Sequence, residues 1–424
     1  MNYYQIKMQK FLNDLPTESM AIIFSGKPVF FSADEYYPFC VNRNFLYLTG
    51  LSEENYILVL LNGKVKKEIL LFANVVSPEI AAWIGESLSF ENIAKITGLS
   101  ISQIKDKKDF DGFMQTIFEN SRRNIYGNIE RIYLDFYKIT PEADNLESHK
   151  FYDKYHKSFP YIKFENCYKQ LQKYRSIKDT NDIALIGEAL KITDEAIKAV
   201  YANAKTGMME YNVESYYNFV LKNYNTKTSF PTICAGGENA TVLHYVSNDS
   251  KINDNDLVLL DLGVYYKGLC SDISRVFPIS GKFSLRQKEV YQAVLDCNKK
   301  MIELVKPGMT FGEFNQIALN FLSKKIVELG ISKDGLDIKK YYWHTLGHQL
   351  GYDVHDVCDY ETPILEGMVL TIEPGLYIKD EKIGIRIEDD VLITADGCIN
   401  LSKDLIKEVS DIEDYMKKNN SNCK

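Results

Sequence analysis

The stretch that most constrains the fold is DLVLLDLGVYYKGLCSDISRVFP, residues 256–278, which has the pattern of two β-strands joined by a short turn. With a turn near Tyr266-Lys267-Gly268, Asp261 and Asp272 are equally far from it. A regular hairpin would then place these two carboxylates opposite each other on one face of the sheet. Because Asp261 stands among leucines, its strand is expected to be buried. Two facing buried carboxylates require a cation or a shared proton, so the hairpin predicts a metal site.

A second hairpin repeats this pattern in TIEPGLYIKDEKIGIRIEDD, residues 371–390. Glu373 and Glu388 are symmetric about Asp380-Glu381 and are expected to face each other, with a possible bulge at Pro374. One such pair is more often a solvated hydrogen-bonding pair. Two pairs on apolar strands strengthen the prediction of a metal centre.

Four of the six histidines lie in the same half of the chain, at His244, His344, His348 and His355. Three of them fall in WHTLGHQLGYDVHD, where Gly347 and Gly351 make a regular helix doubtful. A histidine at helical spacing is more often structural, but this density beside glycines favours a site. Four carboxylates with one imidazole form an oxygen-rich ligand set, which suits Mn²⁺, Fe²⁺ or Co²⁺ better than a structural Zn²⁺.

The bulk properties exclude several classes of protein. A net charge of −8 gives no reason to expect nucleic-acid binding. No apolar run approaches the roughly 20 residues of a membrane span. The eight cysteines are scattered without a CxxC pair, and the first residues lack a secretory apolar segment. We therefore expect reduced thiols and a cytoplasmic protein.

The pattern along the chain predicts an α/β domain at residues 1–172 and a second domain at residues 173–424. In the first, we expect a helix near residues 3–13, a hairpin around Asn62-Gly63 and one helix over residues 79–98. In the second, helical spacing predicts a long helix over residues 180–204. Capping boxes at Ser284 with Gln287 and at Thr310 with Glu313 begin two more helices.

From about residue 175 to 401, the chain resembles the pita-bread metallopeptidases, and within them the Xaa-Pro aminopeptidases (aminopeptidase P). The resemblance is carried by LLDLG, SDISR, HTLGHQLG, DVHD, TIEPG and RIEDD. It implies a curved, mostly antiparallel sheet with covering helices. It also implies five metal ligands, with Asp272 and Glu388 bridging two ions: Asp261, Asp272, His348, Glu373 and Glu388. Thr345 departs from the glycine that many members have after the first histidine.

The resemblance further implies roles for residues around the metals. Glu373 would move a proton, His244 and His355 would orient substrate or stabilise the intermediate, and His344 and Arg386 would line the substrate site. The implied reaction removes the first residue from peptides with proline second, using two divalent ions. Mn²⁺ is the first expectation, and Co²⁺, Fe²⁺ or Zn²⁺ are alternatives.

The first half also resembles this family, in a creatinase-like α/β domain. SADEYYPF and NFLYLTG within residues 31–50 resemble the aminopeptidase P N-domain, as does the helical EIAAWIGESL at 79–88. The segment around Trp83 resembles one that contributes to a neighbouring subunit's active site in some members, which predicts a homodimer or homotetramer. The competing interpretation of Trp83 is a core residue.

Three alternatives remain at this point. An Xaa-Pro dipeptidase (prolidase) shares the fold and ligands. A metal-free pita-bread binding module and a creatinase-like carbon–nitrogen hydrolase are disfavoured, because the five ligands are intact. The expected aminopeptidase is favoured over prolidase by the N-domain motif containing Asp34 and by a 377–384 connection that contains no Arg.

Overall fold

The computed structural model describes residues 2–119 and 124–420. The chain divides into two compact units, residues 1–172 and 173–424. Within the described residues, no helix combines the length and apolar character needed to cross a bilayer.

The first unit is an α/β domain built on a six-stranded sheet. Its strands lie in the order β6-β5-β4-β1-β7-β8, and β4 alone runs antiparallel to its neighbours. A small β2–β3 hairpin stands apart from this sheet. The helices are α1 (Tyr3–Asp14), α2 (Arg43–Thr49), α3 (Pro78–Ile84), α4 (Phe90–Thr97), α5 (Phe110–Phe118) and α6 (Glu147–Tyr155), and α7 (Tyr168–Ser176) crosses the boundary. The strands are β1 (Ser19–Phe24), β2 (Phe30–Ser32), β3 (Glu35–Tyr36), β4 (Ile57–Asn62), β5 (Lys67–Ala73), β6 (Ile104–Asp106), β7 (Arg131–Leu134) and β8 (Lys163–Asn166).

Two local predictions in this unit need correction. The helix expected over residues 79–98 is two helices, because Gly85 takes a positive φ of 90° and ends α3. The second helix begins after Ser89, whose side chain caps it by accepting from the Asn92 backbone N–H at 3.2 Å. The β4–β5 hairpin forms as expected, but Asn62 pairs with Lys67, so the connecting loop spans residues 63–66.

The second unit contains short antiparallel ladders and long helices. Its strands pair in the orders β10-β11-β14, β13-β12-β9, β15-β18-β19 and β16-β17. They are β9 (Lys227–Thr228), β10 (Ile233–Gly236), β11 (Leu257–Leu262), β12 (Val264–Tyr266), β13 (Leu269–Cys270), β14 (Ile273–Pro278), β15 (Val369–Ile372), β16 (Gly375–Ile378), β17 (Ile383–Arg386), β18 (Asp389–Ile393) and β19 (Cys398–Asn400). The helices are α8 (Thr180–Asn203), α9 (Glu210–Asn223), α10 (Leu285–Leu304), α11 (Phe311–Glu328) and α12 (Val409–Asn419).

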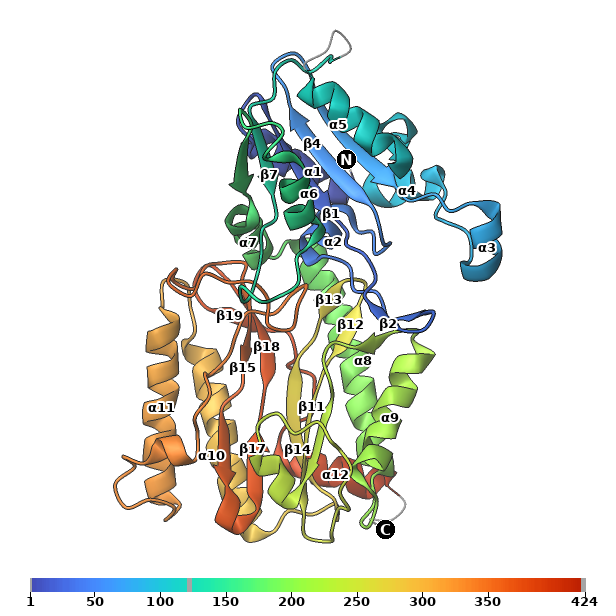
Figure 1. Ribbon diagram of the computed structural model, residues 1–424. Helices are drawn as coiled ribbons and strands as arrows, with labels where there is room; N and C mark the ends of the chain where they lie inside the picture. The colour runs from blue at the N-terminus through green and yellow to red at the C-terminus, as the bar shows by residue number, and fades with distance from the viewer. Residues whose placement is uncertain (1, 120–123, 421–424) are drawn as a thin grey trace. The chain divides into compact units, whose positions relative to one another are not determined.

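The helices of this unit flank the strands. Figure 1 shows α8 and α9 (green) along one side of the ladders and α10 and α11 (orange) along the other. Both predicted capping boxes are present: Ser284 and Gln287 begin α10, and Thr310 and Glu313 begin α11. Thr193, the polar residue on the apolar stripe of α8, is buried and bonds to Ser271 Oγ at 2.8 Å. The strands that carry the predicted site therefore lie between helix layers.

Candidate metal centre

The first carboxylate pair lies on one face of its hairpin, but the two residues are not directly opposite. Asp261 pairs with Ser274, and the turn lies at Lys267 and Gly268, which have positive φ angles of 47° and 98°. The turn centre was expected one residue earlier, and a shift of one residue at the turn moves the partner of Asp261 by two positions, from Asp272 to Ser274. Because side chains alternate with a period of two, Asp272 stays on the same face as a diagonal neighbour.

The second pair faces as predicted. Ile372 pairs with Asp389 before the glutamates and Gly375 pairs with Arg386 after them, in one continuous register. Pro374 therefore introduces no register shift, and Glu373 lies opposite Glu388. The ladder is interrupted at this point, because the Glu373 N–H bonds to Leu346 O at 2.8 Å and the Glu388 N–H bonds to Ser274 O at 3.1 Å.

His348 lies on an irregular loop that runs beside β15, as the glycines indicated. Its backbone exchanges hydrogen bonds with Thr371, and a side chain at Gly347 would come within 1.9 Å of the Thr371 carbonyl oxygen. The His348 Nδ1–H donates to the Gln349 carbonyl at 3.1 Å. This bond leaves the Nε2 lone pair available as a ligand.

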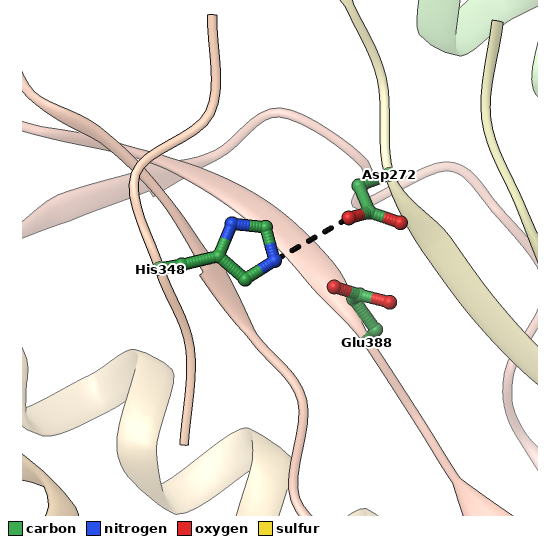
Figure 2. A group of neighbouring side chains, drawn as sticks. All are labelled: Asp272, His348 and Glu388. Carbon is green, nitrogen blue, oxygen red and sulfur yellow. Dashed lines mark ion pairs between the residues drawn. The ribbon is translucent and has the colours of Figure 1, made fainter. Parts of the chain in front are cut away.

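The two hairpins and this loop bring the predicted ligands together. His348 Nε2 lies 3.4 Å from Asp272 Oδ2 and 3.5 Å from Glu373 Oε1. Figure 2 shows the ring directed at the carboxylates of Asp272 and Glu388, and ligand atoms of these three residues lie within 4.8 Å of one another. Asp261 and Asp272 also each bury an Oδ1 atom that finds no hydrogen-bond donor among the described residues.

The electrostatics of the cluster favour a cation. Burial, followed by repulsion from Asp261 and Asp390, raises the pKa of Asp272 well above its ordinary value. Burial and then Asp272 raise the pKa of Glu388 in the same way, and burial raises the pKa of Glu373 to about 7. Ionising these carboxylates together costs free energy, and divalent cations would offset that cost. The donor set and its unpartnered oxygens fit such ions.

Arg386 connects the carboxylate cluster to Tyr377 and His344. Its guanidinium donates to Asp261 Oδ2 at 2.6 Å, to Ser274 Oγ at 2.9 Å and to Tyr377 Oη at 2.9 Å. Tyr377 Oη in turn lies 2.9 Å from His344 Nε2. Because His344 Nδ1 bonds to the Thr345 carbonyl at 2.8 Å, Nδ1 carries the proton and Nε2 accepts from Tyr377. Burial lowers the pKa of His344 to about 3, so the ring is neutral at pH 7.

A cavity of about 540 Å³ opens over the cluster, lined by residues of the second unit alone. All five predicted ligands line it, together with His244, His344, His355 and Arg386. His244 follows the short helix η3 (Gly237–Thr241), and the His355 ring stacks edge-on against His348 at 4.2 Å. Burial and then His348 lower the pKa of His355 to about 4. The nine site residues predicted in the second half of the chain therefore line one cavity.

Several residues that contact this site were not predicted. The hydroxyl groups of Tyr377 and Ser274 accept hydrogen bonds from Arg386, as described above. The Asp272 N–H donates to Asp390 Oδ2 at 3.2 Å. Tyr377 and Asp390 stand inside the motifs GLYIK and RIEDD, so their proximity in sequence to Glu373 and Glu388 was the available signal. Ser274 is the cross-strand partner of Asp261, which the corrected turn position would have identified.

Comparison with known proteins gives a consistent assignment. Residues 184–395 match the model of metallopeptidase family M24, and residues 4–126 match the aminopeptidase P N-terminal domain. The Xaa-Pro aminopeptidase of Haemophilus influenzae is 33% identical over 90% of this chain and 89% of its own length. A solved Bacillus anthracis chain assigned to aminopeptidase P has a TM-score of 0.94 at 39% identity, covering 99% of both chains.

A second solved structure, Escherichia coli aminopeptidase P with the inhibitor Pro-Leu, has a TM-score of 0.87 at 28% identity and covers 98% of both chains. These matches span both units, and the family whose motifs the sequence carries is the family that the comparisons return. The chain therefore belongs to metallopeptidase family M24, the pita-bread metallopeptidases, as one of its Xaa-Pro aminopeptidases.

Proposed function

We infer that the chain is a metal-dependent aminopeptidase that removes the first residue from peptides with proline in the second position. The observation that carries this inference is the set of four carboxylates and His348 at the base of one cavity, in a chain whose relatives are Xaa-Pro aminopeptidases. We further propose that residues 173–424 form the catalytic domain, since all the candidate site residues lie there.

We propose that the centre holds two divalent ions, bound by Asp261, Asp272, His348, Glu373 and Glu388, with Mn²⁺ as the working ion. Two unpartnered carboxylate oxygens and the raised pKa values of three carboxyl groups support a site built for more than one positive charge. Such ions lower the pKa of a bound water and stabilise negative charge on oxygen. The set of four carboxylates with one imidazole is rich in oxygen donors, which favours Mn²⁺ over structural Zn²⁺.

The surrounding residues supply binding and proton transfer. Glu373, whose pKa burial raises to about 7, is suited to accept and return a proton near neutral pH. His244 and His355 line the cavity and are proposed to orient the peptide. His344 and Arg386 are joined through Tyr377, so they form the wall of the substrate site with fixed side chains.

The cavity argues against the dipeptidase alternative. A dipeptidase must neutralise the free carboxylate that follows proline, and this requires an available cation. Among the described residues that line the cavity, Arg386 is the one Arg or Lys side chain, and it already bonds to Asp261, Tyr377 and Ser274. The connection between β16 and β17 is short and contributes no Arg. The far end of the site is therefore unsuited to a dipeptide terminus.

We predict that an Xaa-Pro-Yaa tripeptide is cleaved with at least a tenfold higher kcat/KM than the matching Xaa-Pro dipeptide. Tenfold selectivity needs only about 1.4 kcal/mol of differential transition-state binding. Both substrates should be assayed under the same Mn²⁺ loading, with release of free Xaa followed by chromatography. A tenfold preference for the dipeptide would make the protein a prolidase.

The proposal extends to assembly and location. Trp83 and Ile84 on α3 are 90% and 70% exposed, so Trp83 is not the core residue that was its competing interpretation. An exposed apolar helix supports a homodimer or homotetramer formed through the first unit. A light-scattering mass equal to that of one chain would contradict this assembly.

We also propose a cytoplasmic location, supported by cysteines buried as thiols at Cys167, Cys234 and Cys297. Recovery of the protein from an extracellular fraction would contradict this location.

A further inference from the structure

Asn298 is a buried amide on α10 that contacts the backbone beside both candidate glutamate ligands. It is fully buried. Its Nδ2 donates to Ile372 O at 2.9 Å and to Ile387 O at 3.3 Å. These carbonyls immediately precede Glu373 and Glu388, on opposite sides of the hairpin. One amide group therefore spans the hairpin at the point where the glutamates face each other.

The orientation of the amide is fixed by its other partner. Lys407 Nζ lies 2.9 Å from Asn298 Oδ1, and an ammonium group can only donate. The oxygen must face Lys407, so both N–H groups face the carbonyls. Lys407 also pairs with Asp389, which in turn pairs with Arg275 at 2.9 Å. The Asn298 side chain is thus held in place by a buried charged network behind the site.

The bonds of Asn298 complete the fixing of two peptide groups. The peptide between Ile372 and Glu373 is held at its oxygen by Asn298 and at its nitrogen by Leu346 O. The peptide between Ile387 and Glu388 is held at its oxygen by Asn298 and at its nitrogen by Ser274 O. A planar peptide group held at both its oxygen and its nitrogen fixes the N–Cα bond that follows it, and so fixes where the backbone of each glutamate begins. The hairpin ladder cannot do this alone here, because Pro374 has no N–H and both glutamate N–H groups bond to other segments.

We propose that Asn298 is a positioning residue, which sets the separation and direction of the Glu373 and Glu388 carboxylates and thereby the affinity of the centre for its metal ions. This inference rests on the proposed metal centre. Residues that orient metal ligands contribute about 10- to 100-fold to metal affinity in other proteins. Asn298 touches neither substrate nor ligand side chain, so its effect must pass through the backbone.

The test is the Mn²⁺ affinity of Asn298→Ala and Asn298→Asp, measured by calorimetric titration of the full chain. Asn298→Asp keeps the volume but replaces the two donors with an acceptor. Both variants are expected to bind Mn²⁺ at least about tenfold more weakly than the wild type. The matched control is Asn420→Ala, since Asn420 is also a buried amide whose Nδ2 donates to two carbonyls, Tyr201 O at 3.2 Å and Ala204 O at 2.6 Å.

The control separates positioning from general packing. Asn420→Ala is expected to lower the melting temperature while leaving Mn²⁺ affinity within about twofold of wild type. Unchanged affinity in folded Asn298 variants, or an equal loss in Asn420→Ala, overturns the proposal. If both Asn298 variants fail to give a cooperative melting transition, Asn298 is a folding determinant and the proposal is also overturned. A wild-type chain that binds no Mn²⁺ would instead count against the metal centre itself.

Discussion

Asp272→Asn is expected to lower kcat/KM for an Xaa-Pro-Yaa peptide by about a thousandfold or more, equivalent to about 4 kcal/mol of transition-state stabilisation. The substitution keeps the shape of the side chain but removes one negative charge and one anionic oxygen from the cluster formed with His348 and Glu388. Purified variant and wild type should be compared at saturating Mn²⁺. Activity within tenfold of wild type would exclude Asp272 as a ligand.

The same variant should lose activity without losing its fold. Burial and the neighbouring carboxylates raise the pKa of Asp272, so its ionised form opposes folding when metal is absent. In the presence of a chelator, Asp272→Asn should therefore melt at the same temperature as wild type or above it. The matched control is Asp256→Asn at the start of the same hairpin, where the side chain accepts from the Asn253 N–H at 2.8 Å. It should retain activity within about twofold.

Asp356→Asn is expected to destabilise the second unit by about 3–5 kcal/mol, because it leaves buried positive charge without its partner. Asp356 contacts Arg175 at 2.5 Å and Lys178 at 3.1 Å, and its side chain is fully buried. After substitution Arg175 keeps Asp353 at 2.8 Å, while Lys178 keeps the Gln349 amide oxygen at 3.1 Å. Among the residues that the structure describes, no other carboxylate lies within ion-pair distance of the Lys178 ammonium group.

Urea unfolding can isolate this effect in the second unit. The chain has two tryptophans, and in a Trp83→Phe background Trp343 alone reports on the unit that contains Asp356. The control is Glu188→Gln, which breaks the exposed pair with Lys191 at 2.5 Å and should cost less than about 1 kcal/mol. A decrease of less than 1 kcal/mol in the free energy of unfolding of Asp356→Asn would show that the buried ion cluster does not stabilise this unit.

The pH dependence of this contribution follows from the charges. Burial raises the pKa of Asp356, but Arg175 and Lys178 outweigh burial and lower it below its ordinary value. A depressed pKa in the folded state gives stability that is present at neutral pH and lost as the pH falls below the ordinary aspartate range. The difference in the free energy of unfolding between wild type and Asp356→Asn should therefore become smaller at acidic pH.

The sequence was sufficient for the parts of the site that local patterns determine. The Glu373–Glu388 pairing followed from symmetry about one turn, and the structure has that register. The predicted pairing of Asp261 with Asp272 was wrong, because the turn centre lies one residue later than expected. Tyr266, Lys267 and Gly268 allow more than one two-residue turn. The prediction that both carboxylates share one face of the sheet was still correct, because moving the cross-strand partner by two positions keeps it on the same face.

Contacts between distant segments could not be predicted in the same way. Asn298 stands 74 and 89 residues from the carbonyls that it binds, on a helix whose spacing marks it only as a buried position. The ion cluster around Asp356 likewise joins Arg175 and Lys178 to a loop more than 170 residues away. A single sequence contains no local signal for such pairs, because they depend on how the helices and the loop pack.

The most direct test of the account is the number of metal ions in the active protein. Elemental analysis of Mn²⁺-loaded wild-type chain, with kcat/KM measured on the same sample before and after chelation, is expected to give two ions per chain. Chelation should abolish tripeptide cleavage, and added Mn²⁺ should restore it. A metal content near zero in a sample whose peptidase activity resists chelation would contradict the two-metal centre.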